Sequence, residues 1–399
     1  MKKLLLLGGS YFQLPSIVTA KKMGLYTVVC DYLADNPGQK YADEYWNVST
    51  TDKEAILKLS KKLKIDGILC YASDPAASTA AYVSEKLGLP GQPYNSVEIL
   101  TNKDLFRNFL LKNGFNVPKA KGYKTCEQLQ NEWENFKKPI MVKPVDSSGS
   151  KGVSRVDNIG ELQDKVNLSL TYSRCKRFIA EEYLEKEGYQ IAGDGFSVKG
   201  KLVFRCFANE HFNTASGNPY VPIGESWPYI GSKNVQDKLH NEIQKLLNLL
   251  NMRDGAYNFD ARIGTDGNIY LMEVGPRNGG NLIPQVTRYA TGVDMVEYSI
   301  KAALGMKIDD LAMVDVKGYW SSYIIHSKRN GILDSLIISE RLKKNNIVQF
   351  HMQYKKGDKI NAFNGSNGTL GTMILRFSSS NEMLEKMNNM DSYIDVKVI

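Results

Sequence analysis

Residues 257–274 read YNFDARIGTDGNIYLMEV, two runs of largely alternating polar and apolar residues on either side of Asp266-Gly267. An Asp-Gly pair between such runs is a strong signal for a β-hairpin with a two-residue turn. Counting outward from that turn places Asp260 opposite Glu273. Carboxylates that face each other across two strands repel, so we interpret the pair as a site for a divalent cation, and oxygen ligands favour Mg²⁺. A slipped register that leaves both acids in solvent is the competing interpretation.

The segment after Glu273 reads VGPRNGGN over residues 274–281. Glycine lets a backbone approach a ligand closely, and Arg277 offers a planar fork of donors that suits phosphate or carboxylate. Arg277, Asn278, Gly279 and Gly280 are therefore candidate substrate-binding residues. A plain turn with a surface arginine is the alternative.

Two upstream segments also have the composition of ligand sites. Residues 140–144 (IMVKP) predict a strand that carries Lys143, and a loop of small residues follows it. Such a loop can lay N–H and hydroxyl groups over phosphates, although a flexible surface hairpin would look alike. Residues 178–184 (FIAEEYL) predict a strand that ends in acids, either an edge strand or a hinge that binds an adenine edge. The loop residues are Ser147, Ser148, Gly149, Ser150, Lys151 and Gly152.

The first hundred residues alternate predicted strands (4–7, 27–30, 65–70) with predicted helices (15–23, 53–64, 76–87). This βαβ rhythm predicts a doubly wound parallel sheet. A dinucleotide fingerprint is absent, because Ser10 and Gln13 stand where glycines are required, which argues against NAD.

Further along, the sequence predicts a helix over 101–118, opened by a Thr101/Asp104 capping box. Lys103 then falls in the first turn, where it could help the free N–H groups to hold a phosphate. We also expect a strand at 199–208, helices at 237–250, 295–304 and 381–390, and mixed short elements over the last ninety residues. The fold class is thus α/β, with α+β parts.

Composition excludes several functions. The net charge of +8 is modest for 399 residues, and no arginine-rich arm suggests nucleic acid. Five scattered cysteines favour a reducing compartment. The apolar run at residues 4–7 is too short for a signal peptide, and no stretch is long enough to span a membrane, so we expect a cytoplasmic protein.

Taken in order, these segments resemble the ATP-grasp superfamily, and in particular its carboxylate–amine ligases of the amino-acid ligase kind. The resemblance covers nearly the whole chain. It implies a Rossmann-like (pre-ATP-grasp) domain over 1–100, an ATP-grasp domain over 101–305 with a lid at about 118–182, and a C-terminal subdomain over 306–399.

The resemblance also implies roles for individual residues. Lys103, Lys143 and the 147–152 loop would contact the phosphates of ATP. Glu181, Glu182, Tyr183 and Leu184 would hold adenine, and Gln190 stands where relatives carry a Glu for the ribose. Asp260 and Glu273 would carry Mg²⁺, with Mn²⁺ as a substitute, and Arg277 would act with Lys143 in catalysis.

One departure concerns the metal site. Relatives carry Asn two positions after the second metal acid, and here that residue is Gly275. In the predicted register Asn258 faces Gly275, so Asn258 could supply the missing oxygen; Asn278 is the rival candidate.

The implied activity is formation of an amide from a small carboxylic acid and an amine, with ATP converted to ADP and phosphate. A bicarbonate-using ATP-grasp carboxylase and a non-catalytic nucleotide-binding module are the alternatives. The N-terminal domain and residues 209–232 and 278–288 would select the substrates. Relatives of this kind are commonly dimers, which makes a homodimer the expected assembly.

Overall fold

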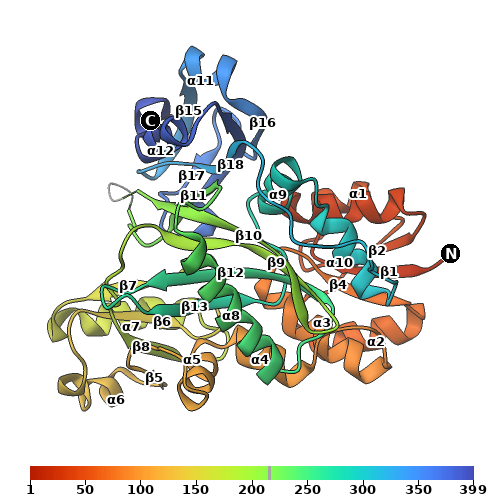
Figure 1. The fold of residues 1–399 in the computed structure, drawn as a ribbon, viewed down its shortest axis with the longest axis horizontal. Coiled ribbons are helices and arrows are strands. Elements are labelled where there is room, and N and C mark those ends of the chain that lie inside the picture. The colour runs from red at the N-terminus through yellow and green to blue at the C-terminus, as the bar shows by residue number, and fades with distance from the viewer. Residues whose placement is uncertain (214–216) are drawn as a thin grey trace.

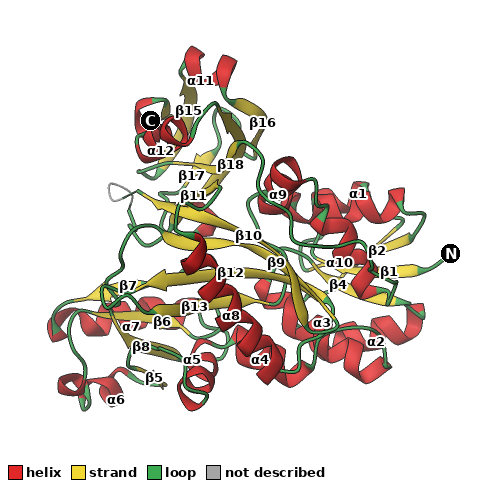
Figure 2. Ribbon diagram, in the orientation of Figure 1, coloured by secondary structure: helices red, strands yellow, loops and turns green. Residues whose placement is uncertain are grey.

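A computed structural model of the chain describes residues 1–213 and 217–399. The architecture is mixed α/β, with a parallel sheet at the N-terminal end and antiparallel sheets elsewhere, which confirms the expected fold class (Figures 1 and 2). The parallel sheet has the order β3-β2-β1-β4. Its strands are β1 (Lys3–Leu7), β2 (Tyr26–Asp31), β3 (Glu44–Asn47) and β4 (Gly67–Cys70).

Apolar side chains on both faces of this sheet explain the helices packed against it. Successive residues of β1 point to opposite faces, because strand side chains alternate. Leu5 and Leu7 enter one core cluster, and Leu4 and Leu6 enter another. The sheet is therefore doubly wound, as predicted. The helices that cover it are α2 (Lys53–Leu63) and α3 (Asp74–Leu87) on one face, and α1 (Leu14–Lys22) and α10 (Met295–Ala303) on the other.

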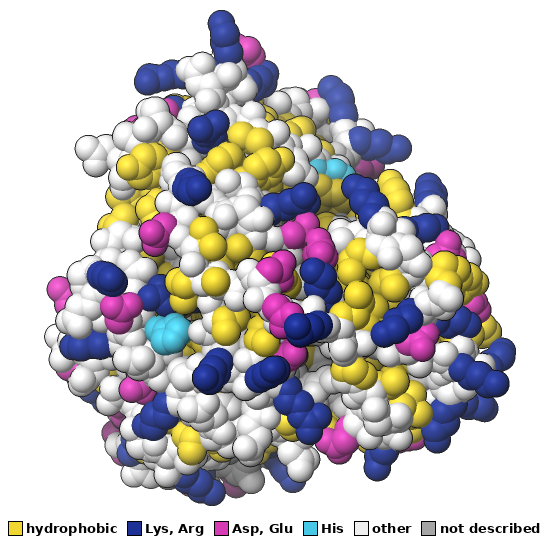
Figure 3. All heavy atoms as spheres, turned by 45° about the vertical axis from the view of Figure 1, so that its right-hand side comes forward, with side chains coloured by type: hydrophobic (Ala, Val, Ile, Leu, Met, Phe, Trp, Pro, Cys, Tyr) yellow, Lys and Arg dark blue, Asp and Glu magenta, His cyan; other side chains and the backbone are white. Residues whose placement is uncertain are grey.

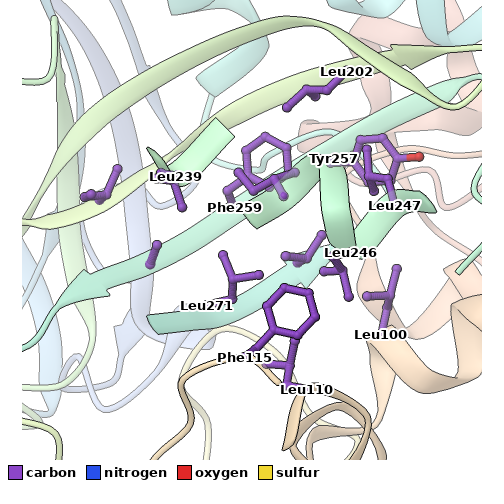
Figure 4. Packing of buried hydrophobic residues seen from close by; sticks show 14 of the residues in the cluster. Leu100, Leu110, Phe115, Leu202, Leu239, Leu246, Leu247, Tyr257, Phe259 and Leu271 are labelled. Carbon is purple, nitrogen blue, oxygen red and sulfur yellow. The ribbon is translucent and has the colours of Figure 1, made fainter. Parts of the chain in front are cut away.

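The central sheet has eight strands in the order β13-β12-β9-β10-β11-β14-β18-β16. Its strands are β9 (Gln190–Val198), β10 (Lys201–Phe212), β11 (Pro222–Trp227), β12 (Gly255–Ile263), β13 (Ile269–Gly275), β14 (Tyr319–His326), β16 (Ile347–Met352) and β18 (Thr369–Phe377). Helix α8 (Lys233–Leu249) crosses one face of this sheet, where Leu246 and Leu247 pack with Phe259 and Leu271 of the hairpin (Figure 4). Helix α9 (Ile283–Thr291) packs into a separate cluster with strand residues such as Phe196.

A smaller unit, here called the lid, lies beside the central sheet (Figure 1). Its four-stranded antiparallel sheet has the order β5-β8-β6-β7 and a core of its own that includes Trp133 and Phe178. Its elements fall within the range expected for a lid from the sequence. They are β5 (Ala120–Tyr123), α6 (Cys126–Gln130), β6 (Ile140–Pro144), β7 (Ser154–Val156), α7 (Leu162–Tyr172) and β8 (Phe178–Glu182).

The C-terminal residues contribute strands to two sheets. Strands β14, β16 and β18 extend the central sheet. The remaining strands form a three-stranded sheet in the order β17-β15-β19. The elements here are β15 (Gly331–Ile338), α11 (Glu340–Asn345), β17 (Lys359–Ile360), α12 (Ser380–Asn388) and β19 (Ile394–Val398). In the described ranges, no helix combines the length and the hydropathy that a membrane span requires.

The hairpin keeps the predicted facing pair, although its turn differs from the prediction. Asp260 pairs with Glu273, and Asn258 pairs with Gly275. The connection is a three-residue loop rather than a two-residue turn, since the Gly264 N–H donates to the Asn268 carbonyl, 2.9 Å away. The register near the loop is therefore shifted by one residue. A β-bulge between Asp260 and Ala261 restores the predicted pairing of the acids.

The predicted helix over 101–118 is wrong in its bounds and its cap. The structure has two helices, α4 (Tyr94–Thr101) and α5 (Lys103–Lys112), separated by the extended residue Asn102. Thr101 does not cap a helix, because its hydroxyl donates to the Val97 carbonyl one turn earlier. Asp104 is instead ion-paired with Arg177.

The strand expected at 199–208 is also displaced. Lys199 and Gly200 both have positive φ and form the turn between β9 and β10. Strand β9 was not predicted, because its run of glycines and small residues lacks the usual composition of a strand. Helix α8 begins four residues before the predicted residue 237, with Ser232 as its N-cap.

Gly193 in β9 is a position where the sheet has no room for a side chain. Its φ is +127°, and an added Cβ would lie 2.1 Å from the Cys206 carbonyl oxygen. We predict that Gly193→Ala lowers the free energy of unfolding by about 2–4 kcal/mol, measured by urea denaturation. Gly160→Ala is the matched control, since nothing lies within 4 Å of its added Cβ. Equal stability of the two variants would contradict this account of the sheet.

Candidate functional site

A cavity of about 340 Å³ lies where the hairpin, the lid and the central sheet meet. Most of the residues singled out in the sequence line it, although they come from distant segments. The structure thus brings together Lys103, Lys143, Ser147, Ser148, Gly149, Ser150, Lys151, Glu181, Tyr183, Leu184, Gln190, Asn258, Asp260, Glu273, Arg277 and Gly280.

Four other candidates, Gly152, Glu182, Asn278 and Gly279, do not line this cavity. Glu182 accepts a hydrogen bond from the Lys137 N–H at 2.8 Å, in an exposed contact. Asn278 is buried, and its Oδ1 accepts from the Ser299 hydroxyl at 2.7 Å. The Gly279 N–H donates to Asp194. Of the two asparagines considered for the metal site, only Asn258 faces the cavity.

Asp260 and Glu273 form the acidic centre of the cavity. Burial and then repulsion from Glu273 raise the pKa of Asp260 to about 7. Lys103 partly offsets the negative charge, with its Nζ 3.3 Å from Glu273. A carboxylate whose charge is this unfavourable without a partner fits a cation site.

The donor set suits a hard cation that is shared with a ligand. Over residues 1–213 and 217–399 there is no cluster of three or more His, Cys, Asp or Glu that could hold a metal. Mg²⁺ is commonly bound through one or two carboxylates, with phosphate oxygens and water completing its shell. Asn258 donates through Nδ2 to Asp194 at 3.0 Å, which leaves its carbonyl oxygen for another contact. Asp260, Glu273 and Asn258 therefore fit Mg²⁺ bound together with a triphosphate.

Sequence reasoning missed three further buried acids, Asp194, Glu210 and Glu225, which lie on β9, β10 and β11. Glu210 pairs with Glu225 across the strands. Burial raises the pKa of both well above the ordinary value, with Asp260 adding to the effect on Glu210 and Asp194 to that on Glu225. The Glu225 Oε2 atom is buried without a hydrogen-bond partner in the described residues. Little in the sequence distinguishes these acids, because they lie in strands of mixed polar and apolar residues.

Glu181 lies at the centre of a buried ion-pair network. It accepts from the Arg107 Nε at 3.0 Å and is ion-paired with Lys143. Burial acts to raise the pKa of Glu181, but Arg107 and Lys143 outweigh it and lower the pKa to about 2. Arg107 also donates to the Leu271 and Met272 carbonyls, so it joins α5 and the lid to the hairpin.

Several polar groups that were predicted to bind adenine already have partners within the protein. The Glu181 carboxylate is engaged by two cations, and the Tyr183 N–H donates to the Pro139 carbonyl at 2.9 Å. The Leu184 carbonyl accepts from Arg262, whose Nε also donates to Gln190. Gln190 is thereby fixed at the cavity wall.

The small-residue loop at 147–152, here called the flap, rests against the C-terminal segment. The Ser366 N–H donates to the Gly149 carbonyl at 2.9 Å, and the Lys103 Nζ donates to the Ser147 carbonyl at 2.9 Å. Gly149 has a φ of +64°, and a Cβ there would lie 2.1 Å from the Ser366 Oγ. This position therefore requires glycine. Ser147 to Lys151 of the flap line the cavity.

Comparison with known protein families agrees with this geometry. Residues 136–285, which carry the flap, the lid strand with Glu181 and the hairpin, match the model of the ATP-grasp domain. Residues 136–285 form an ATP-grasp domain. The resemblance to the ATP-grasp superfamily is thus confirmed for these residues.

Individual relatives are more distant. The carbamoyl phosphate synthase large chain of Thermoanaerobacter sp. (strain X514) is 25% identical over 264 residues, which is 65% of this chain and 24% of that protein. The chain thus spans about a quarter of the length of that relative. The formate-dependent phosphoribosylglycinamide formyltransferase of Prochlorococcus marinus (strain NATL2A) is 30% identical over 192 residues, 46% of this chain and 48% of the relative.

Among solved structures, the L-amino acid ligase from Bacillus licheniformis superposes with a TM-score of 0.81 and 21% identity. That match covers 100% of this chain and 99% of the other. At this identity the match shows a shared fold over the whole length, including the segments that flank the ATP-grasp domain.

The raised pKa of Asp260 in the ATP-grasp domain makes stability depend on pH. An unfolded Asp titrates near 4, so between about 4 and 7 the folded protein binds more protons than the unfolded one. We predict that the stability contributed by protonated Asp260 is lost as pH rises through this window in metal-free buffer. Asp260→Asn should flatten that fall, measured as unfolding free energy against pH. Asp164→Asn, on the exposed face of α7, is the control; an unchanged slope in Asp260→Asn would contradict the prediction.

Proposed function

We propose that the chain is an ATP- and Mg²⁺-dependent carboxylate–amine ligase that forms an amide through an acyl phosphate and releases ADP and phosphate. One observation carries the proposal. A single cavity combines the facing acids Asp260 and Glu273 with the cations Lys103, Lys143 and Arg277 and with residues of the flap. A relative whose name describes a formate-dependent enzyme uses a carboxylate, which agrees with this chemistry.

The cations and the flap would bind the triphosphate. Lys103 and Lys143 supply positive charge, and the flap supplies backbone N–H groups and the hydroxyls of its serines. Asp260, Glu273 and Asn258 would hold Mg²⁺, or Mn²⁺ in its place, and the cation would neutralise charge on the phosphates. Gln190 and the segment at Tyr183 and Leu184 would contact the nucleoside.

The proposed reaction has two bond-forming steps. A substrate carboxylate oxygen attacks the γ-phosphorus, and the bond to the leaving ADP oxygen breaks. Arg277 and Lys143 stabilise the charge of the transferred phosphoryl group. The amine nitrogen then attacks the acyl carbon, phosphate leaves with its oxygen, and the amine loses a proton. Closure of the flap over the bound substrates would exclude water, which would otherwise hydrolyse the acyl phosphate.

Two alternatives from the sequence remain testable, carboxylation with bicarbonate and nucleotide binding without catalysis. The buried acids Glu210 and Glu225 line the cavity and can accept hydrogen bonds from a substrate that carries an amino group, which favours the ligase over the carboxylase. Two substrates, a small acid and an amine, are therefore the proposed partners, and the homodimer stays a prediction.

The experiment that tests the proposal uses hydroxylamine as a general amine. The full chain is incubated with ATP, Mg²⁺, hydroxylamine and a panel of carboxylic acids, and both ADP and hydroxamate are measured. We expect equal amounts of ADP and hydroxamate with at least one acid. ADP release that depends on bicarbonate alone would point to the carboxylase, and nucleotide binding without ADP release would point to the binding module.

Lys143 offers a direct mutational prediction. We predict that Lys143→Met lowers kcat for ADP release by about 10²–10³-fold, because it removes a cation that meets the transferred phosphoryl group. Glu181 keeps Arg107 as a partner in this variant, so the fold should persist. Lys124→Met, at an exposed position of the lid, is the control. Equal kcat values for the two variants would exclude the assigned role of Lys143.

A further inference from the structure

Arg277 is held by Asp74, a residue that was not selected from the sequence. Its Nε and Nη2 donate to the two carboxylate oxygens of Asp74, both at 2.6 Å. Asp74 lies 203 residues earlier, at the start of α3 and just beyond the carboxyl end of β4. The side chains are only 10% and 19% exposed, so solvent screens this bidentate pair weakly.

The pair determines which part of Arg277 is left for a ligand. Three of the five guanidinium N–H groups are used, two by Asp74 and one by the Asn278 carbonyl, 3.0 Å from Nη1. The N–H groups that remain are one on Nη1 and one on Nη2, at the tip of the side chain. Arg277 lines the main cavity, so this tip is available to an anion there.

Gly275 is the position that makes room for the pair. The Arg277 N–H donates to the Gly275 carbonyl at 2.8 Å, a tight turn that folds the arginine back over the glycine. A Cβ on Gly275 would lie 3.0 Å from the Asp74 Oδ1 and 3.3 Å from the Arg277 Cζ. Both distances are shorter than ordinary van der Waals contact, so a longer side chain at 275 would press on the Asp74–Arg277 pair. This crowding agrees with a glycine at the position where the resemblance led us to expect Asn.

Asp74 also lies between two cavities. It lines the main cavity and a second cavity of about 380 Å³ between α3, α4 and the lid. The two cavities share Asp74, Lys103, Ser147 and Glu273. The Asp74–Arg277 pair thus forms part of the wall beside the acidic centre. A shift of Asp74 would change the shape of both cavities.

We propose that Asp74 is a positioning residue of the ligase: it clamps Arg277 with the guanidinium tip toward the main cavity, and glycine at 275 is required for this clamp. The inference rests on the proposed function. Arg277 contacts the reacting phosphoryl group, whereas Asp74 acts through Arg277. A carboxylate clamp fixes the donor before substrate binds, so less orientation has to be gained during the reaction.

The stability arm of the test needs no substrate. Asp74→Ala, Gly275→Asn and the double variant are unfolded thermally without ligand. Gly275→Asn should lower Tm in the wild-type background and lower it less in the Asp74→Ala background, since the space is then free. An equal loss in both backgrounds would overturn the proposed crowding.

The kinetic arm measures acid-dependent ADP release at varied acid concentration. Asp74→Ala should lower kcat by about 10²-fold with little change in KM, and the conservative variant Asp74→Asn should retain more activity because one acceptor remains. Asp164→Asn is the control for charge. If Asp74 merely occupied the place of a substrate anion, Asp74→Ala would lower KM and keep kcat, and that result would overturn the clamp.

The two arms separate the clamp from the proposed function. A wild-type chain that releases no ADP with any acid would refute the ligase assignment alone. The thermal unfolding of the single and double variants would then still show whether Asp74 and a side chain at 275 compete for the same space. Wild-type activity together with unchanged kcat in Asp74→Ala would refute the clamp and leave the ligase standing.

Discussion

The repulsion between Asp260 and Glu273 is the interaction around which the cavity is organised. The β12–β13 hairpin holds the two carboxylates opposite each other, and their partial burial weakens the screening of their charges by water. Folding therefore carries a cost at this point that a bound cation would remove. Lys103 offsets part of that cost from α5, and the same lysine holds the flap at Ser147. The acidic centre and the flap are thus connected through one side chain.

The surrounding structure keeps these groups in register. Arg107 binds Glu181 of the lid and the carbonyls of Leu271 and Met272 in the hairpin, so the lid and the hairpin share an anchor. Asp194 accepts from the Gly279 N–H and from Asn258, which fixes the loop beside the acids. On the face shown in Figure 3, Lys and Arg side chains are interspersed with Asp and Glu, without a continuous basic strip. The charge that matters for the proposed chemistry is inside the cavity.

Local patterns were sufficient to predict much of the fold. The apolar strand at residues 4–7, the helix over 76–87 and the facing acids of the hairpin were all predicted from spacing and turn chemistry. The loop of the hairpin was not, because Asp266-Gly267 fits both a two-residue turn and the observed three-residue loop. The β-bulge between Asp260 and Ala261 compensates for the extra loop residue. The alternation of polar and apolar residues in the strand does not indicate where such a bulge will occur.

The parts that could not be predicted depend on contacts between distant segments. Nothing near Asp74 indicates that it will meet Arg277, and nothing near Gly149 indicates Ser366 as its neighbour. Glu210 and Glu225 were missed for a related reason: their importance comes from the strands beside them, which place them against Asp260 and Asp194. Such residues are recognised only once the sheet order is known.

The most direct test of this account is a crystal of the full chain grown with Mn²⁺ and a non-hydrolysable ATP analogue, with anomalous scattering used to locate the metal. The account predicts an anomalous peak between Asp260 and Glu273, with a carboxylate oxygen of each in the coordination shell of the metal and the triphosphate beneath the flap. A peak elsewhere, or the two side chains directed away from each other with the nucleotide bound, would contradict it.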